Sequence, residues 1–182
     1  MTRVGREASR VVLEAPSRER EAEFLARVGA SRKLHRPWVK APSTVRQFRD
    51  LVARSRGERH ASFFVCTRAS AELAGVINVN EIVRGLFQSA YLGYYAFEPF
   101  AGAGYMSEGL TLVIGRAFGE LGLHRLEANV QPANRPSIRL VSELGFRLEG
   151  LSPRYLKIAG RWRDHERWAL LAESWRKRRA RG

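Results

Sequence analysis

A glycine-rich turn between a predicted strand and a predicted helix is the stretch best suited to chemistry. Residues 94–108 read Tyr-Tyr-Ala-Phe-Glu-Pro-Phe-Ala-Gly-Ala-Gly-Tyr-Met-Ser-Glu. Its glycines let the backbone approach a ligand closely, and the following helix presents unpaired N–H groups and the positive end of its dipole. Such a turn suits a pyrophosphate, although it also occurs where a strand simply packs against a helix. The candidate donors are the amides of Gly102, Ala103, Gly104, Tyr105 and Met106.

Residue spacing speaks against several other common sites. The four histidines are scattered without H-E-x-x-H spacing, so no metal site is expected. The glycines do not fit G-x-G-x-x-G, and neither a phosphate-binding P-loop motif nor a G-x-S-x-G elbow occurs. Cys66 is the one cysteine, which excludes an internal disulfide. It lies in an apolar run, so we interpret it as a buried, inert thiol rather than a nucleophile.

The pattern of apolar residues predicts the elements that position the turn. Strands are expected at residues 10–15, 61–67, 73–79, 89–97 and 125–130, followed by a hairpin around Ala159-Gly160 that ends near residue 171. Helices are expected at residues 17–28, 43–55, 106–121 and 134–144, with Gly29 ending the first. This order predicts one mixed α/β domain spanning residues 1–182.

Positive charge is concentrated at the two ends of the chain. The net charge is +14; residues 1–60 hold 15 Lys and Arg against 7 Asp and Glu, and the last nine residues hold five against none. This surplus suits RNA or another polyanion, and it equally suits a solvated surface. After Trp175 the tail has no large apolar residue, so residues 176–182 are expected to be mobile, outside a core of about residues 10–175.

Nothing in the sequence predicts contact with a membrane. There is no apolar run of about 18 residues, and the N-terminus lacks the apolar core of a signal peptide. We therefore expect a cytoplasmic protein, and the sequence leaves open whether it is a monomer or a homodimer.

Five ordered motifs carry a resemblance to a known family. They are Ala101-Gly102-Ala103-Gly104, His124-Arg125-Leu126-Glu127-Ala128, Asn134–Ser137, Leu144–Gly150 and Gly160–His165. Together they resemble the GNAT superfamily of N-acetyltransferases and, within it, the RimJ/RimL branch, which acetylates the N-terminal amines of ribosomal proteins. The string Trp162-Arg163-Asp164-His165 is most similar to RimJ. The sequence departs from the family at Ala101 and Ala103, where a Gln or Arg and a basic residue are usual.

The resemblance implies a GNAT fold, in which a mostly antiparallel sheet flanked by helices splits at the acetyl-CoA site. It also implies direct acetyl transfer from acetyl-CoA to an amine, without a metal. Ser137 matches the hydroxyl placed beside the CoA sulfur and is the candidate general acid, and Asn134 matches a contact to the pantetheine arm. Either residue could instead serve only the start of its helix. Backbone N–H groups of Ala96 or Phe97 would pair with the pantetheine arm.

The general base and the acceptor site are less sharply indicated. Glu81, just after a predicted strand, is the first candidate for a base acting through water, and Glu127 is the second. Trp38 lies in the loop where related enzymes wall the peptide site, although it could simply anchor that loop. Tyr155 and Trp162 could border the pocket, but we favour a place in the core of the hairpin for each.

We therefore expect an acetyl-CoA-dependent enzyme that acetylates the N-terminus of a ribosomal protein. The basic N-terminal third and tail would then contact rRNA or the ribosome. Two alternatives stay open: acetylation of a small amine such as an antibiotic or a polyamine, and a non-catalytic ribosome- or RNA-binding factor.

Overall fold

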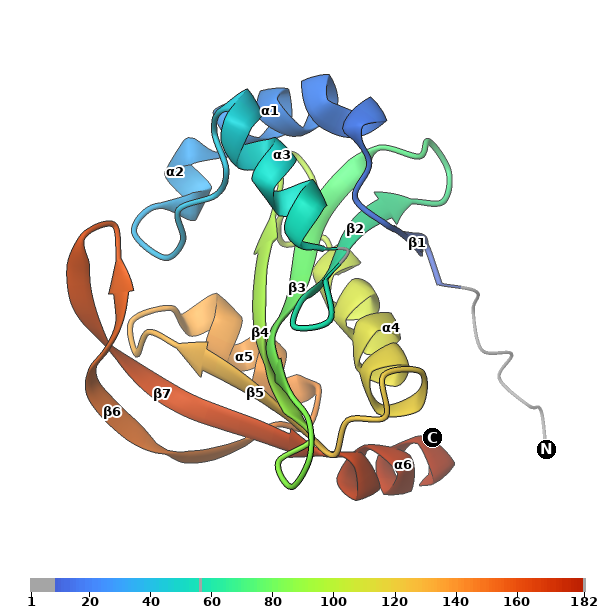
Figure 1. Cartoon of the computed structure of the whole chain (residues 1–182), viewed down its shortest axis with the longest axis vertical. Helices are drawn as coiled ribbons and strands as arrows, with labels where there is room; N and C mark the ends of the chain where they lie inside the picture. Colours follow the sequence, from blue (N-terminus) through green and yellow to red (C-terminus); the bar gives the residue numbers. More distant parts are fainter. Residues whose placement is uncertain (1–8, 56, 182) are drawn as a thin grey trace.

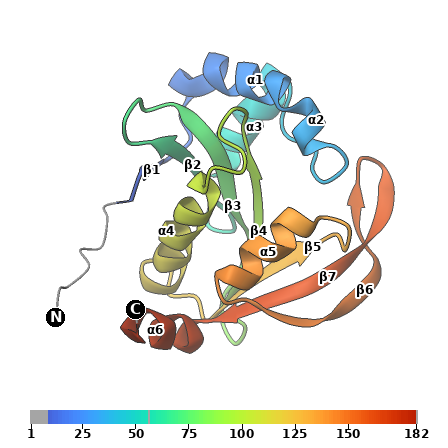
Figure 2. The same cartoon turned by 180° about the vertical axis from the view of Figure 1, so that it is seen from behind.

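The computed structural model describes residues 9–55 and 57–181, and every statement below concerns these residues. Seven strands form one sheet in the order β1-β2-β3-β4-β5-β7-β6 (Figures 1 and 2). The strands are β1 Val11–Glu14, β2 Ala61–Thr67, β3 Leu73–Val83, β4 Ser89–Ala96, β5 Arg125–Val130, β6 Arg147–Ile158 and β7 Arg161–Leu171. The helices are α1 Glu21–Ala30, α2 Arg32–His35, α3 Val45–Arg54, α4 Tyr105–Gly119, α5 Arg135–Glu143 and α6 Ala172–Arg181, with a 3-10 turn η1 at Arg18–Arg20.

The sheet opens between its two parallel neighbours. All other strand pairs are antiparallel, whereas β4 and β5 run parallel and pair from Ser89 with Arg125 to Leu92 with Ala128. Beyond Leu92 the two strands have no further paired residues, although β4 continues to Ala96 and β5 to Val130. The backbone edges of both strands are therefore available to a ligand at this split, and the predicted mostly antiparallel, split sheet is confirmed.

Two apolar cores hold the helices on opposite faces of the sheet. One core packs α4 and α5 against the sheet, with Val113 and Val141 among its buried side chains. The other joins α1 and α3 to the sheet through Phe24, Phe48 and Phe64. In Figure 2, α4 and α5 lie side by side in front of the sheet, while α1 and α3 lie together near its upper end. The split between β4 and β5 thus lies in a sheet that is covered by helices on both faces.

Two glycines let α4 approach the sheet closely. A Cβ at Gly109 would lie 2.7 Å from a methyl of Val65, and a Cβ at Gly75 would lie 2.8 Å from the Tyr95 carbonyl oxygen and would also overlap Met106 Sδ. Both distances are too short for a side chain, so the first turns of α4 sit where they do because these residues are glycine. This contact fixes the N-terminus of α4 at the mouth of the split.

The observed elements agree with most of the predicted ones, with three corrections. The first predicted helix is a 3-10 turn followed by α1, which continues through Gly29. Residues 172–181, which include most of the tail expected to be mobile, form helix α6, because Trp175 is only 6% exposed and anchors it to the core. Trp162, expected in the core of the hairpin, is 60% exposed near its tip.

Candidate active site

A cavity of about 520 Å³ occupies the split and extends along the N-termini of α4 and α5. Its wall is built from α2 and the following loop, the end of β4, the glycine turn and one side of α5. The lining residues include His35, Trp38, Tyr94, Ala96, Ala101, Gly102, Gly104, Met106, Asn134, Arg135, Ser137, Arg139 and Glu143. Seven residues predicted from the sequence to bind or react therefore share one cavity: Trp38, Ala96, Gly102, Gly104, Met106, Asn134 and Ser137.

A hydrogen bond between two hydroxyl groups crosses this cavity. Tyr94 Oη, from β4, lies 2.6 Å from Ser137 Oγ, from the first turn of α5. Burial raises the pKa of Tyr94 to about 12, and the hydrogen bond with Ser137 lowers it only in part. The phenol therefore stays protonated at neutral pH and can donate to Ser137. Sequence reasoning identified Ser137 but not Tyr94.

The start of α5 is held by Asn134, which caps the helix. Its Oδ1 accepts a hydrogen bond from the Ser137 N–H at 3.3 Å, and Pro136 follows within the first turn. The cap uses the side-chain oxygen of Asn134, so the side-chain NH₂ group is the part that can donate to a ligand. Asn134 thus also orients Ser137 toward the cavity.

Only one of the two predicted strand amides faces the split. The Phe97 N–H donates to the Ala74 carbonyl at 2.8 Å, which removes it as a donor and corrects that expectation. Because backbone groups alternate along a strand, those of Ala96 point away from β3 and toward the split. The Ala96 carbonyl already pairs with Nε2 of the buried His35 at 2.8 Å. This leaves the Ala96 N–H to pair with a ligand.

The glycine turn presents a set of amides with no internal acceptor. Ala103 N–H donates to Phe100, and the N–H groups of Ser107 and Glu108 donate to Gly104, which caps α4 with φ of +87°. The prediction that the Ala103 N–H is free to bind a ligand is therefore wrong. Within the described chain, no acceptor lies within hydrogen-bond reach of the amides of Gly102, Gly104, Tyr105 and Met106. Together with the helix dipole, these four groups can hold an anion.

Positive charge reaches the cavity from α5 rather than from the turn itself. Arg135 and Arg139 both line the cavity from α5, one helical turn apart. Arg10 lies on the other side of the turn, donates to the Ala103 carbonyl at 3.0 Å and pairs with Glu108. The arginines of α5 therefore provide charge that Ala101 and Ala103 lack. The sequence signal that could have identified Arg135 and Arg139 is their position two residues before and two residues after Ser137.

The two predicted carboxylates lie outside the cavity lining. Glu81 sits at an irregularity of β3, is exposed and pairs with Arg59. Glu127 is opposite Tyr91, one pair before the sheet splits, and its Oε1 accepts from Arg125 Nε at 2.8 Å. Two residues farther, Asn129 Oδ1 is buried without a hydrogen-bond partner in the described chain. Because side chains alternate, Glu127 and Asn129 share the sheet face opposite α5.

Aromatic side chains border that face. Trp38 lines the cavity, and its carbonyl accepts from Gln131 Nε2 at 3.4 Å. Tyr155, on β6, is not part of the lining; its ring centroid lies 6.5 Å from that of His165. Tyr155 therefore lies outside the cavity that holds the hydroxyl pair, beside His165 of the β6–β7 hairpin.

The described part of the chain contains neither a candidate metal-binding cluster nor a helix that could span a membrane. No group of three or more His, Cys, Asp or Glu side chains in the described ranges is arranged to hold a metal ion. No helix among residues 9–55 and 57–181 has the length and hydropathy needed to cross a bilayer. Cys66 is buried, and burial raises the pKa of its thiol to about 12, as expected for an unreactive cysteine.

Fold and cavity together are those of an acyltransferase with a split sheet, and comparison with known proteins gives the family. Residues 10–147 match the acetyltransferase (GNAT) domain, and the chain belongs to this family. The solved structure of Mycobacterium smegmatis RimJ in complex with CoA-disulfide superposes with a TM-score of 0.84 at 27% identity, covering 94% of this chain and 89% of that one.

Two curated relatives match the chain over parts of their length. "Probable N-acetyltransferase YjcK" of Bacillus subtilis is 39% identical over 60% of each chain. The [ribosomal protein uS5]-alanine N-acetyltransferase of Escherichia coli is 41% identical over 57% of this chain and 54% of its own. The matched segments thus span somewhat more than half the length of these two relatives.

Proposed function

We propose that this protein transfers an acetyl group from acetyl-CoA to the α-amino group at the N-terminus of a ribosomal protein. The observation that carries the proposal is the Tyr94–Ser137 hydroxyl pair, set across the split of the sheet and in one cavity with the free amides before α4. An acetyl-CoA molecule bound across them would have its thioester beside the proton donor and its pyrophosphate at the anion site.

The cavity has the donors that acetyl-CoA requires. The amides of Gly102, Gly104, Tyr105 and Met106 would hold the pyrophosphate, with Arg135 and Arg139 adding charge from α5. The side-chain NH₂ of Asn134 would bind the pantetheine arm along the edge of β4, while the Ala96 N–H would donate to the thioester carbonyl. In this arrangement CoA continues the sheet edge that β5 leaves open at Leu92.

Ser137 acts as the general acid in this proposal. Acetyl-CoA supplies an activated thioester; the acceptor nitrogen bonds to its carbonyl carbon, and the carbon–sulfur bond breaks. The Ser137 hydroxyl gives its proton to the departing sulfur and recovers one from Tyr94, whose protonated phenol is 2.6 Å away. Tyr94 then regains its proton from water, which balances the proton that the amine loses to the base. The Ala96 N–H donates to the carbonyl oxygen, where negative charge develops.

A carboxylate acting through water removes the proton of the amine. We propose Glu127 for this role ahead of Glu81, because Glu127 lies on a strand that borders the split, whereas Glu81 lies on β3, which does not border it. Asn129 Oδ1, buried on the same face and without a partner among the described residues, would accept a hydrogen bond from the acceptor amine. Trp38 and Tyr155 would flank the acceptor peptide on this face.

The distribution of charge favours a ribosomal acceptor over a polyamine. A surplus of positive charge in residues 1–60 and in α6 would attract rRNA in the cytoplasm, while it would repel a polycation such as spermidine. The relative that acetylates ribosomal protein uS5 supports the same acceptor class. A small uncharged or anionic amine is the second candidate, since the mouth of the cavity does not by itself require a peptide.

Incubation of the purified protein with labelled acetyl-CoA and isolated ribosomal proteins, followed by mass spectrometry of the N-termini, tests this proposal. We expect label on one or a few N-terminal amines, and clearly less with Ser137→Ala over the same time. Label on lysine side chains, or turnover only with small amines, would exclude the proposed acceptor.

A further inference from the structure

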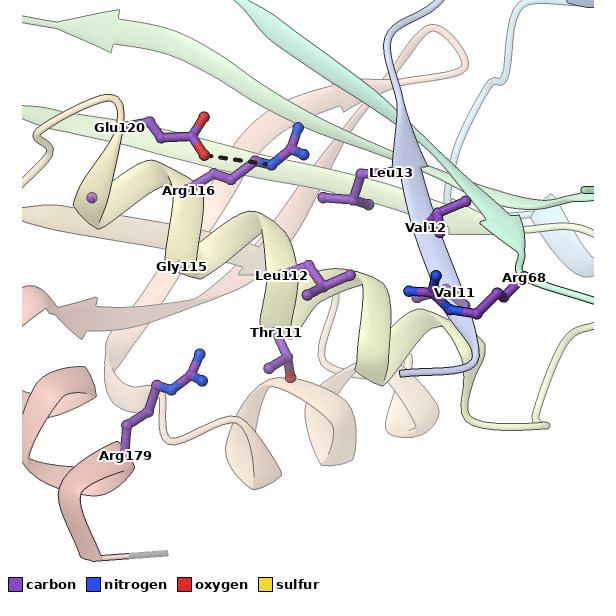
Figure 3. Close-up of a pocket in the computed structure, with 11 residues that line it drawn as sticks. Val11, Val12, Leu13, Arg68, Thr111, Leu112, Gly115, Arg116, Glu120 and Arg179 are labelled. Carbon is purple, nitrogen blue, oxygen red and sulfur yellow. Dashed lines mark ion pairs between the residues drawn. The ribbon is translucent and has the colours of Figure 1, made fainter. Parts of the chain in front are cut away.

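A second groove, separate from the cavity at the split, runs along the outer side of α4. It has a volume of about 680 Å³ and lies between β1, α4 and α6 (Figure 3). None of its lining residues lines the cavity at the split. Its floor is Leu112, Gly115 and Gly119 of α4, and the absence of side chains at the two glycines deepens it.

One wall of this groove is the free edge of the sheet. β1 is the terminal strand, and three consecutive residues of it, Val11, Val12 and Leu13, line the groove. Side chains alternate between faces, so consecutive residues share a groove through their backbone edge. Because the Arg68 N–H bonds the Arg10 carbonyl, alternation turns the Leu13 N–H and C=O away from β2 and toward the groove.

Three guanidinium groups surround the groove. Arg68, Arg116 and Arg179 come from the end of β2, from α4 and from α6, and Figure 3 shows their side chains around the groove. Glu120 is the one acidic residue of the lining, and it pairs with Arg116 at 3.7 Å on the exposed helix surface. An exposed pair of this kind contributes little and exchanges readily. The groove therefore combines a strand edge, an aliphatic floor and a positive rim.

We propose that this groove binds an extended acidic peptide of another protein, which adds to the free edge of β1. Backbone hydrogen bonds to Leu13 would fix its position, an aliphatic side chain would occupy the floor over Gly115, and carboxylates would pair with Arg68, Arg116 and Arg179. Charge complementarity selects the acidic peptide. The aliphatic floor distinguishes it from a nucleic acid, which would use stacking aromatic side chains or phosphate contacts alone.

Fluorescence anisotropy with a labelled octapeptide of alternating glutamate and leucine tests the proposal. Gly115→Leu should fill the floor, since a Cβ there meets only the end of the Arg179 side chain at 4.0 Å. We expect Gly115→Leu to weaken peptide binding at least about tenfold, equivalent to about 1.4 kcal/mol, with unchanged affinity for acetyl-CoA. Gly29→Leu, at a helical glycine with no neighbour within 4 Å, is the matched control and should bind as the wild type.

Peptide chemistry tests the strand pairing without any variant. Two isomers of the octapeptide, N-methylated either at all glutamates or at all leucines, block opposite edges of the added strand. We expect one isomer to lose at least about tenfold in affinity and the other to bind like the parent, because about two hydrogen bonds are lost from one edge only. Octaglutamate should bind at least about tenfold more weakly than the parent peptide, since it lacks the aliphatic side chains.

Several results would overturn the proposal. They are equal affinity of Gly115→Leu and wild type, equal affinity of the two N-methyl isomers, or octaglutamate binding as tightly as the parent. A short RNA duplex that binds more tightly than the octapeptide and is equally sensitive to Gly115→Leu would assign the groove to nucleic acid. A dimer in sedimentation that Gly115→Leu dissociates would assign it to a second copy of the chain.

Discussion

Tyr94 Oη lies 2.6 Å from Ser137 Oγ. This contact joins the end of β4, where β4 no longer pairs with β5, to the first turn of α5. The two residues are 43 positions apart in the sequence, and each is held by its own element: Tyr94 by the β3–β4 ladder and Ser137 by the Asn134 cap. The pair is therefore set before any ligand binds, which favours a proton donor over a side chain that only fills space.

Removal of the Ser137 hydroxyl should slow acetyl transfer. We expect Ser137→Ala to lower kcat by about 10–1,000-fold, the lower part of the range for acid–base catalysis, while the KM for acetyl-CoA changes much less. Steady-state kinetics on the true acceptor measures this. A wild-type kcat in this variant would show that Ser137 has no role in catalysis and only donates its backbone N–H to the Asn134 cap.

Tyr94 should act through Ser137 rather than independently. Tyr94→Phe keeps the ring and removes the hydroxyl, so kcat should fall, and the double variant should be no slower than Ser137→Ala. Because the pKa of Tyr94 is about 12, the wild-type rate should show no loss from ionisation of this phenol up to about pH 10. Additive effects of the two substitutions on the logarithm of kcat would contradict the relay.

Gly104 should be required for acetyl-CoA binding. Its φ is +87°, and a Cβ would also lie 3.0 Å from the Arg10 guanidinium, so Gly104→Ala strains the turn that carries the free amides. We expect the affinity for acetyl-CoA in calorimetry to fall by about tenfold or more. Gly29→Ala, in an unconstrained helical position, should leave both affinity and folding unchanged or slightly improve stability.

The two candidate bases can be separated by substitution. Glu127→Gln should lower kcat/KM by about 100-fold or more, whereas Glu81→Gln should change it by less than about threefold. If steady-state kinetics shows the larger loss for Glu81→Gln instead, the base is Glu81 and its pairing with Arg59 must be rearranged in the complex with the acceptor.

Protonation of the Glu108 carboxylate should lower the free energy of unfolding in acid. Burial alone would raise its pKa, but the hydrogen bonds from the Arg10 side chain and backbone outweigh this, and the pKa lies below its usual value. A carboxylate with a lowered pKa stabilises the fold above its unfolded pKa of about 4.3, and this contribution is lost as the pH falls through the folded value. Urea unfolding between pH 6 and about pH 3 should therefore show a smaller loss for Glu108→Gln than for wild type.

The amino-acid sequence alone determined the local parts of this protein. Alternating and helical apolar patterns gave β2 and β5 with their observed bounds, Asn134 was identifiable at the start of its helix, and the apolar run around Cys66 predicted a buried thiol. These features depend on neighbours within a few residues, so their causes can be read in order along the chain.

Tertiary structure alone decided how the distant parts meet. The Phe97 N–H bonds the Ala74 carbonyl, whereas the Ala96 N–H faces the split. This assignment depends on the register of β3 and β4, and a shift of one residue would exchange the two N–H groups. His35 reaches the Ala96 carbonyl from 61 positions away. The charged tail becomes α6 because one tryptophan finds a place in the core, a contact that no pattern within the tail itself records.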